Sequence, residues 1–273
     1  MYTIPCVPDF NYRGGYEMYD IQKASMLKRI SAFLLDFVLM TIAVTGFAFL
    51  ITAITGYDNH VNTFEAKRAE YEEIYNIDLD MTEEEKSAMS AAEREAYDKR
   101  LAEADEAFSK DETVLIALNM MFNLILITVS LSLLLSFLLL EFAVPMFLKN
   151  GQTVGKKIFA IGVVHENSVK ISGFALFSRT ILGKYTVETM IPVIVIITML
   201  FGGAGLEGLI LLVLLIGLQL FVFFKNKLNT PLHDVLGHTV AVDLSTQMIF
   251  DNVDELIAYK KKIHAETAEK ADY

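Results

Sequence analysis

The stretch ISAFLLDFVLMTIAVTGFAFLITAIT, residues 30–55, is the part of the sequence that most restricts the fold. It contains one charged residue, Asp36, in 26 positions. A helix that crosses a bilayer needs about 20 mostly apolar residues, so this stretch predicts a transmembrane helix. The composition agrees, because 53% of the 273 residues are hydrophobic and there is only one cysteine. These values exclude a disordered chain and a domain held together by internal disulfides.

Three further apolar stretches follow. Residues 113–140 contain no charge in 28 positions, and residues 206–224 are also long enough to cross a bilayer. Residues 186–201 are short for a span, but Ile181 and Leu182 can supply the missing length, with Lys184 reaching toward the lipid headgroups. We therefore predict an all-α membrane protein with four transmembrane helices, and prefer this arrangement to one with a re-entrant hairpin.

Basic residues in short loops predict the orientation, because such loops stay in the cytoplasm. No cleavable signal peptide is expected, since residues 1–28 lack an apolar segment. Both termini are expected in the cytoplasm and residues 56–112 outside it, in a multi-pass protein of the cell membrane. The basic residues that flank the first span or lie between the second and third spans are Lys23, Lys28, Arg29, Lys149, Lys156, Lys157, Lys170, Arg179 and Lys184.

The predicted outer loop carries the acidic excess of the chain. Residues 56–112 hold 18 acidic and 7 basic side chains, a net charge of −11 that equals the net charge of the whole chain. The remainder is balanced, so nucleic-acid binding is not expected. Capping-box patterns at Thr82 to Glu85 and at Ser90 to Glu93 predict helices, which we interpret as a helical hairpin.

Within this loop, Asp78, Asp80, Thr82 and Glu84 alternate like the start of a calcium-binding loop. The sixth position lacks glycine and the twelfth lacks glutamate, so we favour a solvated acidic face and expect no metal. At the other end, the tail has an amphipathic pattern that fits either docking on the inner membrane surface or an ordinary cytosolic helix.

The predicted organisation has three parts. Residues 1–29 form a cytoplasmic N-terminal segment, and residues 30–242 form the four-span domain with residues 56–112 inserted. Residues 243–273 form a cytoplasmic tail with an amphipathic helix.

Asp36 is the strongest candidate for a functional residue. An ionisable side chain within a span is costly and by default marks a functional site or a charged partner. Arg29 lies two turns earlier on the same helix face, and the two residues are expected to share a polar cluster that Glu141 and Glu188 can join. The sequence NGQTVGKK at 150–157 lacks the spacing of a phosphate-binding loop.

Enzyme chemistry has no support from the sequence. We find no nucleophile and base at a recognised spacing, and His233, Asp234 and His238 do not match a zinc motif. We therefore expect no catalytic residues, no cofactor and no metal.

Taken in order, several of these segments resemble the RDD family. The family name records one arginine and two aspartates, which by position correspond to Arg29, Asp36 and Asp234. The resemblance implies a bacterial multi-pass membrane protein for which transport is often suggested and sodium/proton exchange is proposed in some members. The large acidic loop departs from the compact family pattern. The segments that carry the resemblance are Arg29, Asp36, GQTVGKKIFAIGVV at 151–164, Arg179 and LHDVLGHTVAV at 232–242, and the family motif loop consists of Gly151, Thr153, Gly155 and Lys156.

Two functions remain open from the sequence. In the first, the protein exchanges a cation for a proton. Asp36 binds the ion, Arg29 tunes the proton affinity of Asp36, and Asp234 holds a cytoplasmic gate. Glu141 and Arg179 belong to the same network. Four spans rarely enclose a pathway alone, so this function predicts a homo-oligomer. In the second, the charges are a structural ion-pair network and the acidic loop recruits an extracytoplasmic protein partner.

Overall fold

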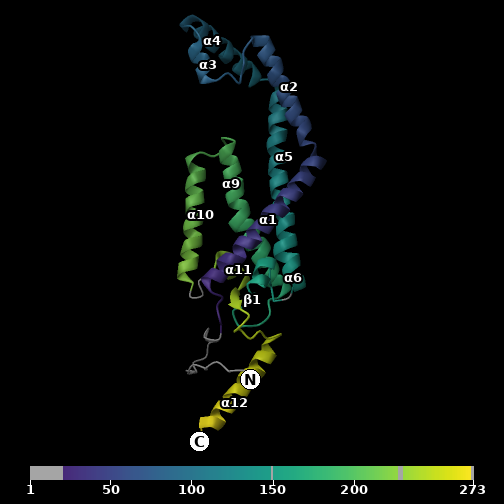
Figure 1. Ribbon diagram of the computed structural model, residues 1–273, viewed down its shortest axis with the longest axis vertical. Coiled ribbons are helices and arrows are strands. Elements are labelled where there is room, and N and C mark those ends of the chain that lie inside the picture. Colours follow the sequence, from purple (N-terminus) through teal and green to yellow (C-terminus); the bar gives the residue numbers. More distant parts are fainter. Residues whose placement is uncertain (1–20, 149, 227–229, 272–273) are drawn as a thin grey trace. The chain divides into compact units, whose positions relative to one another are not determined.

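The computed structural model describes residues 21–148, 150–226 and 230–271 (Figure 1). Residues 1–20, most of the predicted N-terminal segment, lie outside the described residues. The chain divides into two compact units. Unit 1 comprises residues 1–37, 140–188 and 213–273, and unit 2 comprises residues 38–139 and 189–212.

Within the described residues, four helices are long and apolar enough to cross a membrane, which confirms the predicted number. The first is α1, Met26–Thr55, and the last is α10, Leu206–Lys225. The second and third each join several elements. They are Glu112–Leu148, made of α5 (Glu112–Phe137), η2 (Leu138–Ala143) and α6 (Val144–Leu148), and Gly173–Leu200, made of α8 (Gly173–Phe177), η3 (Ser178–Met190) and α9 (Ile191–Leu200).

The third span is longer than the apolar stretch that predicted it. Its 28 residues begin at Gly173 because the polar segment before Thr186 continues the helix as η3. Both η2 and η3 are π-helices, and each ends just before a proline, Pro145 or Pro192. Proline cannot donate the regular backbone hydrogen bond, and a wider turn before it relieves the clash of its ring with the preceding turn.

In unit 2 the acidic segment forms three helices, α2 (Tyr57–Tyr75), α3 (Glu83–Ala88) and α4 (Ala91–Phe108). Figure 1 shows α2 lying beside α5. The two predicted capping boxes are present, with Thr82 and Ser90 at the N-caps of α3 and α4. Ile77, Tyr97 and Ala104 form a buried cluster, so this helical segment has a small core of its own.

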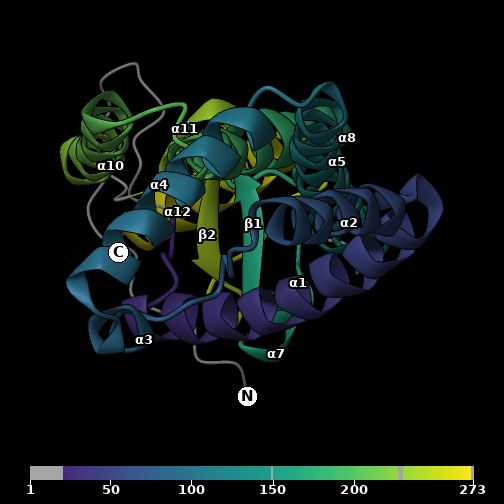
Figure 2. The ribbon, with the colours of Figure 1, turned by 90° about the horizontal axis from the view of Figure 1, so that it is seen from above.

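In unit 1 the chain forms a two-stranded antiparallel sheet that the all-α prediction missed. Strand β1, Ile161–His165, pairs with β2, Thr239–Asp243 (Figure 2). Both strands are five residues long and almost wholly buried. Valine-rich runs of this length favour a strand, but they are too short to identify as strands from periodicity alone.

Three further helices of unit 1 precede or follow these strands in the sequence. They are α7 (Val154–Ile158), α11 (Leu232–Gly237) and α12 (Val253–Ala271). The amphipathic tail helix α12 places Leu256 in a buried cluster with Val169 and Phe250. Part of the apolar stripe of the tail therefore packs within unit 1.

The register of the sheet can be tested with a disulfide. Val163 and Ala241 lie directly opposite each other. The Val163 N–H and the Ala241 C=O both bond away from the partner strand, so the two residues form a non-hydrogen-bonded pair, whose side chains lie closer together. In a Cys6→Ser background, we expect Val163→Cys with Ala241→Cys to cross-link under mild oxidation. Val163→Cys with Thr239→Cys should stay reduced, because Thr239 lies two positions from Ala241 on β2 and pairs with His165. Cross-linking of the second pair instead, followed by mass spectrometry, would contradict the register.

Candidate functional site

Asp36 holds helix α7 against helix α1. One carboxylate oxygen, Oδ2, accepts a hydrogen bond from Thr153 Oγ1 at 2.5 Å, and Oδ1 accepts one from the Gly155 N–H at 2.8 Å. Thr153 is also the N-cap of α7, where its hydroxyl accepts a bond from the Lys156 N–H. The carboxylate of the span thus satisfies donors in the first turn of α7 that have no partner within the helix.

Gly155 is required by this contact. A Cβ atom there would lie 2.3 Å from the carbonyl oxygen of Ala32 and 2.9 Å from Asp36 Cγ. Gly151 has a different role, because its φ of +60° lies in the left-handed region. The turn at Gly151 is held to β1 by the hydrogen bond from Val163 N–H to the Asn150 carbonyl, at 2.8 Å. The family motif loop therefore connects α1, α7 and β1.

Arg179 and Asp234 form a buried ion pair. Arg179 Nε donates to Asp234 Oδ1 at 2.5 Å, and the two side chains are 2% and 4% exposed. Thr239 Oγ1, at the start of β2, donates to the same oxygen at 2.8 Å. Gly237 lets α11 approach, because a Cβ there would lie 2.8 Å from Arg179 Cβ. The pair thus joins η3, α11 and β2.

The charges around Asp234 determine its protonation. Burial alone would raise the pKa of this carboxyl, but the Arg179 guanidinium, His233 and the Thr239 hydroxyl together hold the pKa well below its usual range. Burial lowers the pKa of His233, against the opposing effect of Asp234 and Glu188. At neutral pH the aspartate is therefore charged and the imidazole neutral.

Two more contacts complete the charged cluster. Lys184 Nζ lies 2.7 Å from Glu141 Oε2, and Thr180 Oγ1 donates to the Glu141 carbonyl at 3.0 Å. Glu188 accepts the His233 backbone N–H at 2.9 Å and lies 2.8 Å from His233 Nδ1. Thus Glu141 of the second span and Glu188 of the third both take part in polar contacts within unit 1.

Arg29 extends the same cluster. Its Nε donates to the Ala24 carbonyl at 2.9 Å, and its guanidinium interacts electrostatically with Asp234. The hydrogen bonds found for Asp36 go to Thr153 and Gly155 at the start of α7, and the polar cluster expected to join Arg29 and Asp36 stays a prediction. The buried-charge cluster, as we call it, contains the anions Asp36, Glu141, Glu188 and Asp234 and the cations Arg29, Lys156, Arg179 and Lys184, with His233 beside them.

Sequence reasoning missed part of this cluster. Lys184 was expected to reach toward lipid headgroups, and His233 was considered only as a metal ligand. The signal that could have found Lys184 is its spacing, since it lies five residues after Arg179 and four residues before Glu188. In a π-helix, which has more residues per turn than an α-helix, such positions lie on nearly the same face.

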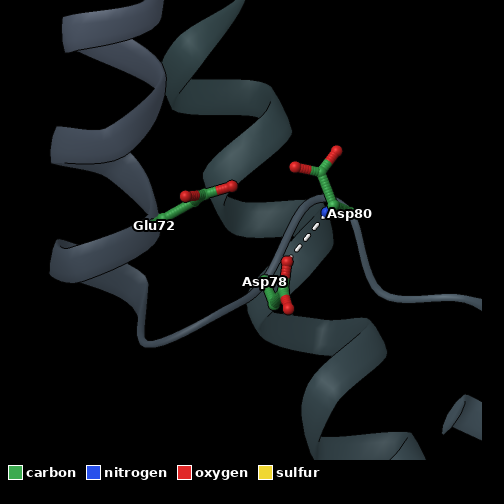
Figure 3. A group of neighbouring side chains, drawn as sticks. All are labelled: Glu72, Asp78 and Asp80. Atoms are coloured by element: carbon green, nitrogen blue, oxygen red, sulfur yellow. Dashed lines mark hydrogen bonds between the residues drawn. The ribbon is translucent and has the colours of Figure 1, made fainter.

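The acidic segment of unit 2 contains a separate group of carboxylates. Glu72, Asp78 and Asp80 place oxygens within 4.8 Å of one another (Figure 3). Arg68 lies 2.5 Å from Asp80, and Glu72 accepts the Leu79 N–H. Thr82 caps α3 instead of joining the group. Asp78 and Asp80 are exposed, Glu72 is half-buried, and all three already have partners, so the geometry assigns no cation to them.

The four apolar helices and the buried charges near their ends define a multi-pass integral membrane protein. The chain belongs to the RDD family, whose sequence model matches residues 23–238. No curated protein and no solved structure matched the chain. The matched range contains all nine residues of the cluster and strand β1, and it ends one residue before β2.

The close approach at Gly155 predicts a large effect of one methyl group. Gly155→Ala should destabilise the protein by about 1–3 kcal/mol, because backbone atoms of α1 must move to accommodate it. Gly46→Ala, also on a span, is the matched control, since nothing lies within 4 Å of its added Cβ. Thermal unfolding in detergent measures both. Equal melting midpoints for the two variants would contradict the contact.

The buried ion pair predicts non-additive effects. Arg179→Met should cost about 3–5 kcal/mol, because it leaves the Asp234 charge buried without its partner. Adding Asp234→Asn removes that charge and keeps an oxygen for Thr239, so the double variant should be more stable than Arg179→Met alone. A double-mutant cycle of unfolding free energies checks this, and additive values would show that the two groups do not interact.

Proposed function

We propose that this RDD protein exchanges a monovalent cation for a proton across the membrane. The observation that carries the proposal is the buried-charge cluster, in which side chains from three spans meet α7 and α11. Charged groups in such surroundings are costly, and proteins keep them there mainly where ions or protons move. The cluster holds four carboxylates and four cations, which gives it a balanced charge that a single proton or cation can change.

The proposed orientation follows from the basic residues in short loops. The loop that contains α7 and β1 carries Lys156, Lys157 and Lys170, so it belongs in the cytoplasm together with both termini. The acidic helices α2, α3 and α4 then lie outside a bacterial plasma membrane. In that position their negative charge would raise the local concentration of cations at the outer surface.

Asp36 is the proposed cation-binding residue, and its contact with α7 gives the exchange a mechanical step. Both carboxylate oxygens are hydrogen-bonded to Thr153 and Gly155. A cation that binds Asp36 must compete with these donors, so binding loosens α7. Asp234 is proposed to keep the cytoplasmic end closed through its bond to Arg179.

A homo-oligomer is part of the proposal. Few side chains of the four spans are buried in the single chain, and large apolar residues such as Phe49, Ile127 and Leu214 are exposed. Exposed faces of this kind are covered by lipid or by other subunits. A pathway between copies would supply the walls that four helices alone do not.

A second candidate is a membrane scaffold that moves no ion. Two observations favour it: the carboxylates of the cluster are paired or hydrogen-bonded, and the acidic helices have their own buried cluster around Tyr97. Buried ion pairs can fix the arrangement of helices without any transport role. In this case the acidic surface would bind a protein partner outside the membrane.

Ion flux separates the two functions. In liposomes with a proton gradient, the parent protein should take up sodium or potassium, and Asp36→Asn should reduce the uptake about tenfold or more by removing the negative charge. The amide keeps an acceptor for Gly155, so the fold should survive. Asp251→Asn, at an exposed surface ion pair with Lys170, is the control and should leave flux unchanged. If the parent moves neither ion, the scaffold function is favoured.

A further inference from the structure

Lys156 differs from the neighbouring cations of the buried-charge cluster. Arg179 and Lys184 each lie within 2.7 Å of a carboxylate oxygen. Lys156 is half-buried, yet over the described ranges none of the carboxylates lies within the 4.0 Å of a salt bridge from its ammonium. A lysine held among charges without a direct ion pair has less to keep its proton in place.

The position of Lys156 is fixed by its backbone. Its N–H bonds to the Thr153 hydroxyl, and the adjacent Gly155 is pressed against α1. Helix α7 therefore cannot turn to carry the ammonium into water without breaking the Asp36 contacts. Lys157, the next residue, lies on the exposed side of the same helix.

Charged groups from four elements act on Lys156. Asp36 of α1, Glu141 of η2 and Asp234 of α11 attract its ammonium, and Arg179 and Lys184, both of η3, repel it. Burial is the largest effect, and with the two cations it lowers the pKa of Lys156 from its ordinary value of 10.5 to about 7. Such a group can gain and lose a proton at physiological pH.

We propose that Lys156 is the proton carrier of the exchange, and that its ammonium and a monovalent cation occupy the cluster alternately. This assignment rests on the proposed function. When the ammonium releases its proton to water, the cluster loses one positive charge, and one sodium or potassium ion restores it. Return of a proton to the amine expels the cation, so one proton moves for each cation.

Alternate occupancy explains why a lysine is placed here. An arginine would keep its proton at all relevant pH values, and a neutral residue would carry none. The carboxylates that attract the ammonium are the same groups that would attract the cation. The cluster needs no additional charged residue to couple the two ions.

Proton release on cation binding tests the assignment without transport. The purified full chain in detergent, in weak buffer at pH 7, is titrated with sodium chloride and then potassium chloride while released protons are measured. The parent should release about half a proton per bound cation, because about half of the Lys156 amines carry a proton when the pH equals the pKa. Lys156→Arg should release none, and Lys157→Arg, the exposed neighbour, should behave as the parent. Equal release from Lys156→Arg and the parent would overturn the proposal.

Flux measurements distinguish failure of this assignment from failure of the proposed function. If the parent moves neither ion in liposomes, the exchange function itself is wrong. If the parent moves a cation, Lys156→Arg should lose about tenfold or more of the uptake driven by the proton gradient, because the guanidinium stays protonated at all relevant pH values. If Lys156→Arg retains the parent's uptake and pH profile, only the role of Lys156 is wrong.

Lys156→Gln provides a second variant that does not depend on accommodating the larger guanidinium. It is neutral, so cation uptake that remains should no longer respond to the proton gradient.

Stability gives an independent check, since the folded parent binds fewer protons than the unfolded chain between pH 7 and 10.5. The unfolding free energy of the parent should therefore rise with pH in this range relative to Lys156→Gln, and parallel curves would contradict the proposal.

Discussion

The cost of burying a carboxylate is the constraint on which this structure depends. Asp234 is almost fully enclosed and must keep the Arg179 guanidinium beside it. That requirement seats α11 on η3, and the bond from Thr239 to the same carboxylate fixes the start of β2. Strand β2 pairs with β1, the turn at Asn150 holds β1, and the following helix α7 is tied to Asp36 on α1. Asp36 and Asp234 therefore stand at opposite ends of one connected set of contacts.

The π-helix η3 allows the third span to take part in these contacts. Its wider turns bring Arg179, Lys184 and Glu188 to one side, where they meet Asp234, Glu141 and His233. An α-helix of the same sequence would rotate successive charges by 100° per residue and spread them around the axis. The polar half of this span thus has partners within unit 1, whereas the apolar half, α9, carries the exposed isoleucines expected of a lipid-facing helix.

The features that the sequence predicted are those that depend on local composition. Runs of apolar residues located the four spans, and the patterns at Thr82 and Ser90 located two helix starts, because each signal lies within a few positions. The sheet was missed because its two strands are five residues each and separated by more than 70 positions. For the site, Asp36, Asp234 and Arg179 were candidates from the sequence, but the hydroxyl partners of the two aspartates were not predicted. Thr153 lies 117 positions from Asp36, Thr239 bonds to Asp234 from beyond the end of α11, and the spacing of Lys184 follows a π-helical period that an α-helical analysis does not consider.

At the centre of the small sheet, the outer edge of each strand is paired with another segment of the chain. Val242 of β2 pairs with Lys23 on the side away from β1, and Val164 of β1 pairs with Lys170 on the side away from β2. A strand with an unoccupied edge is a template on which another chain can add. Here short irregular segments of the same chain fill both positions, which prevents β-augmentation at this level. The proposed homo-oligomer would therefore have to form through side chains on helices, where lipid covers the same faces and competes with it.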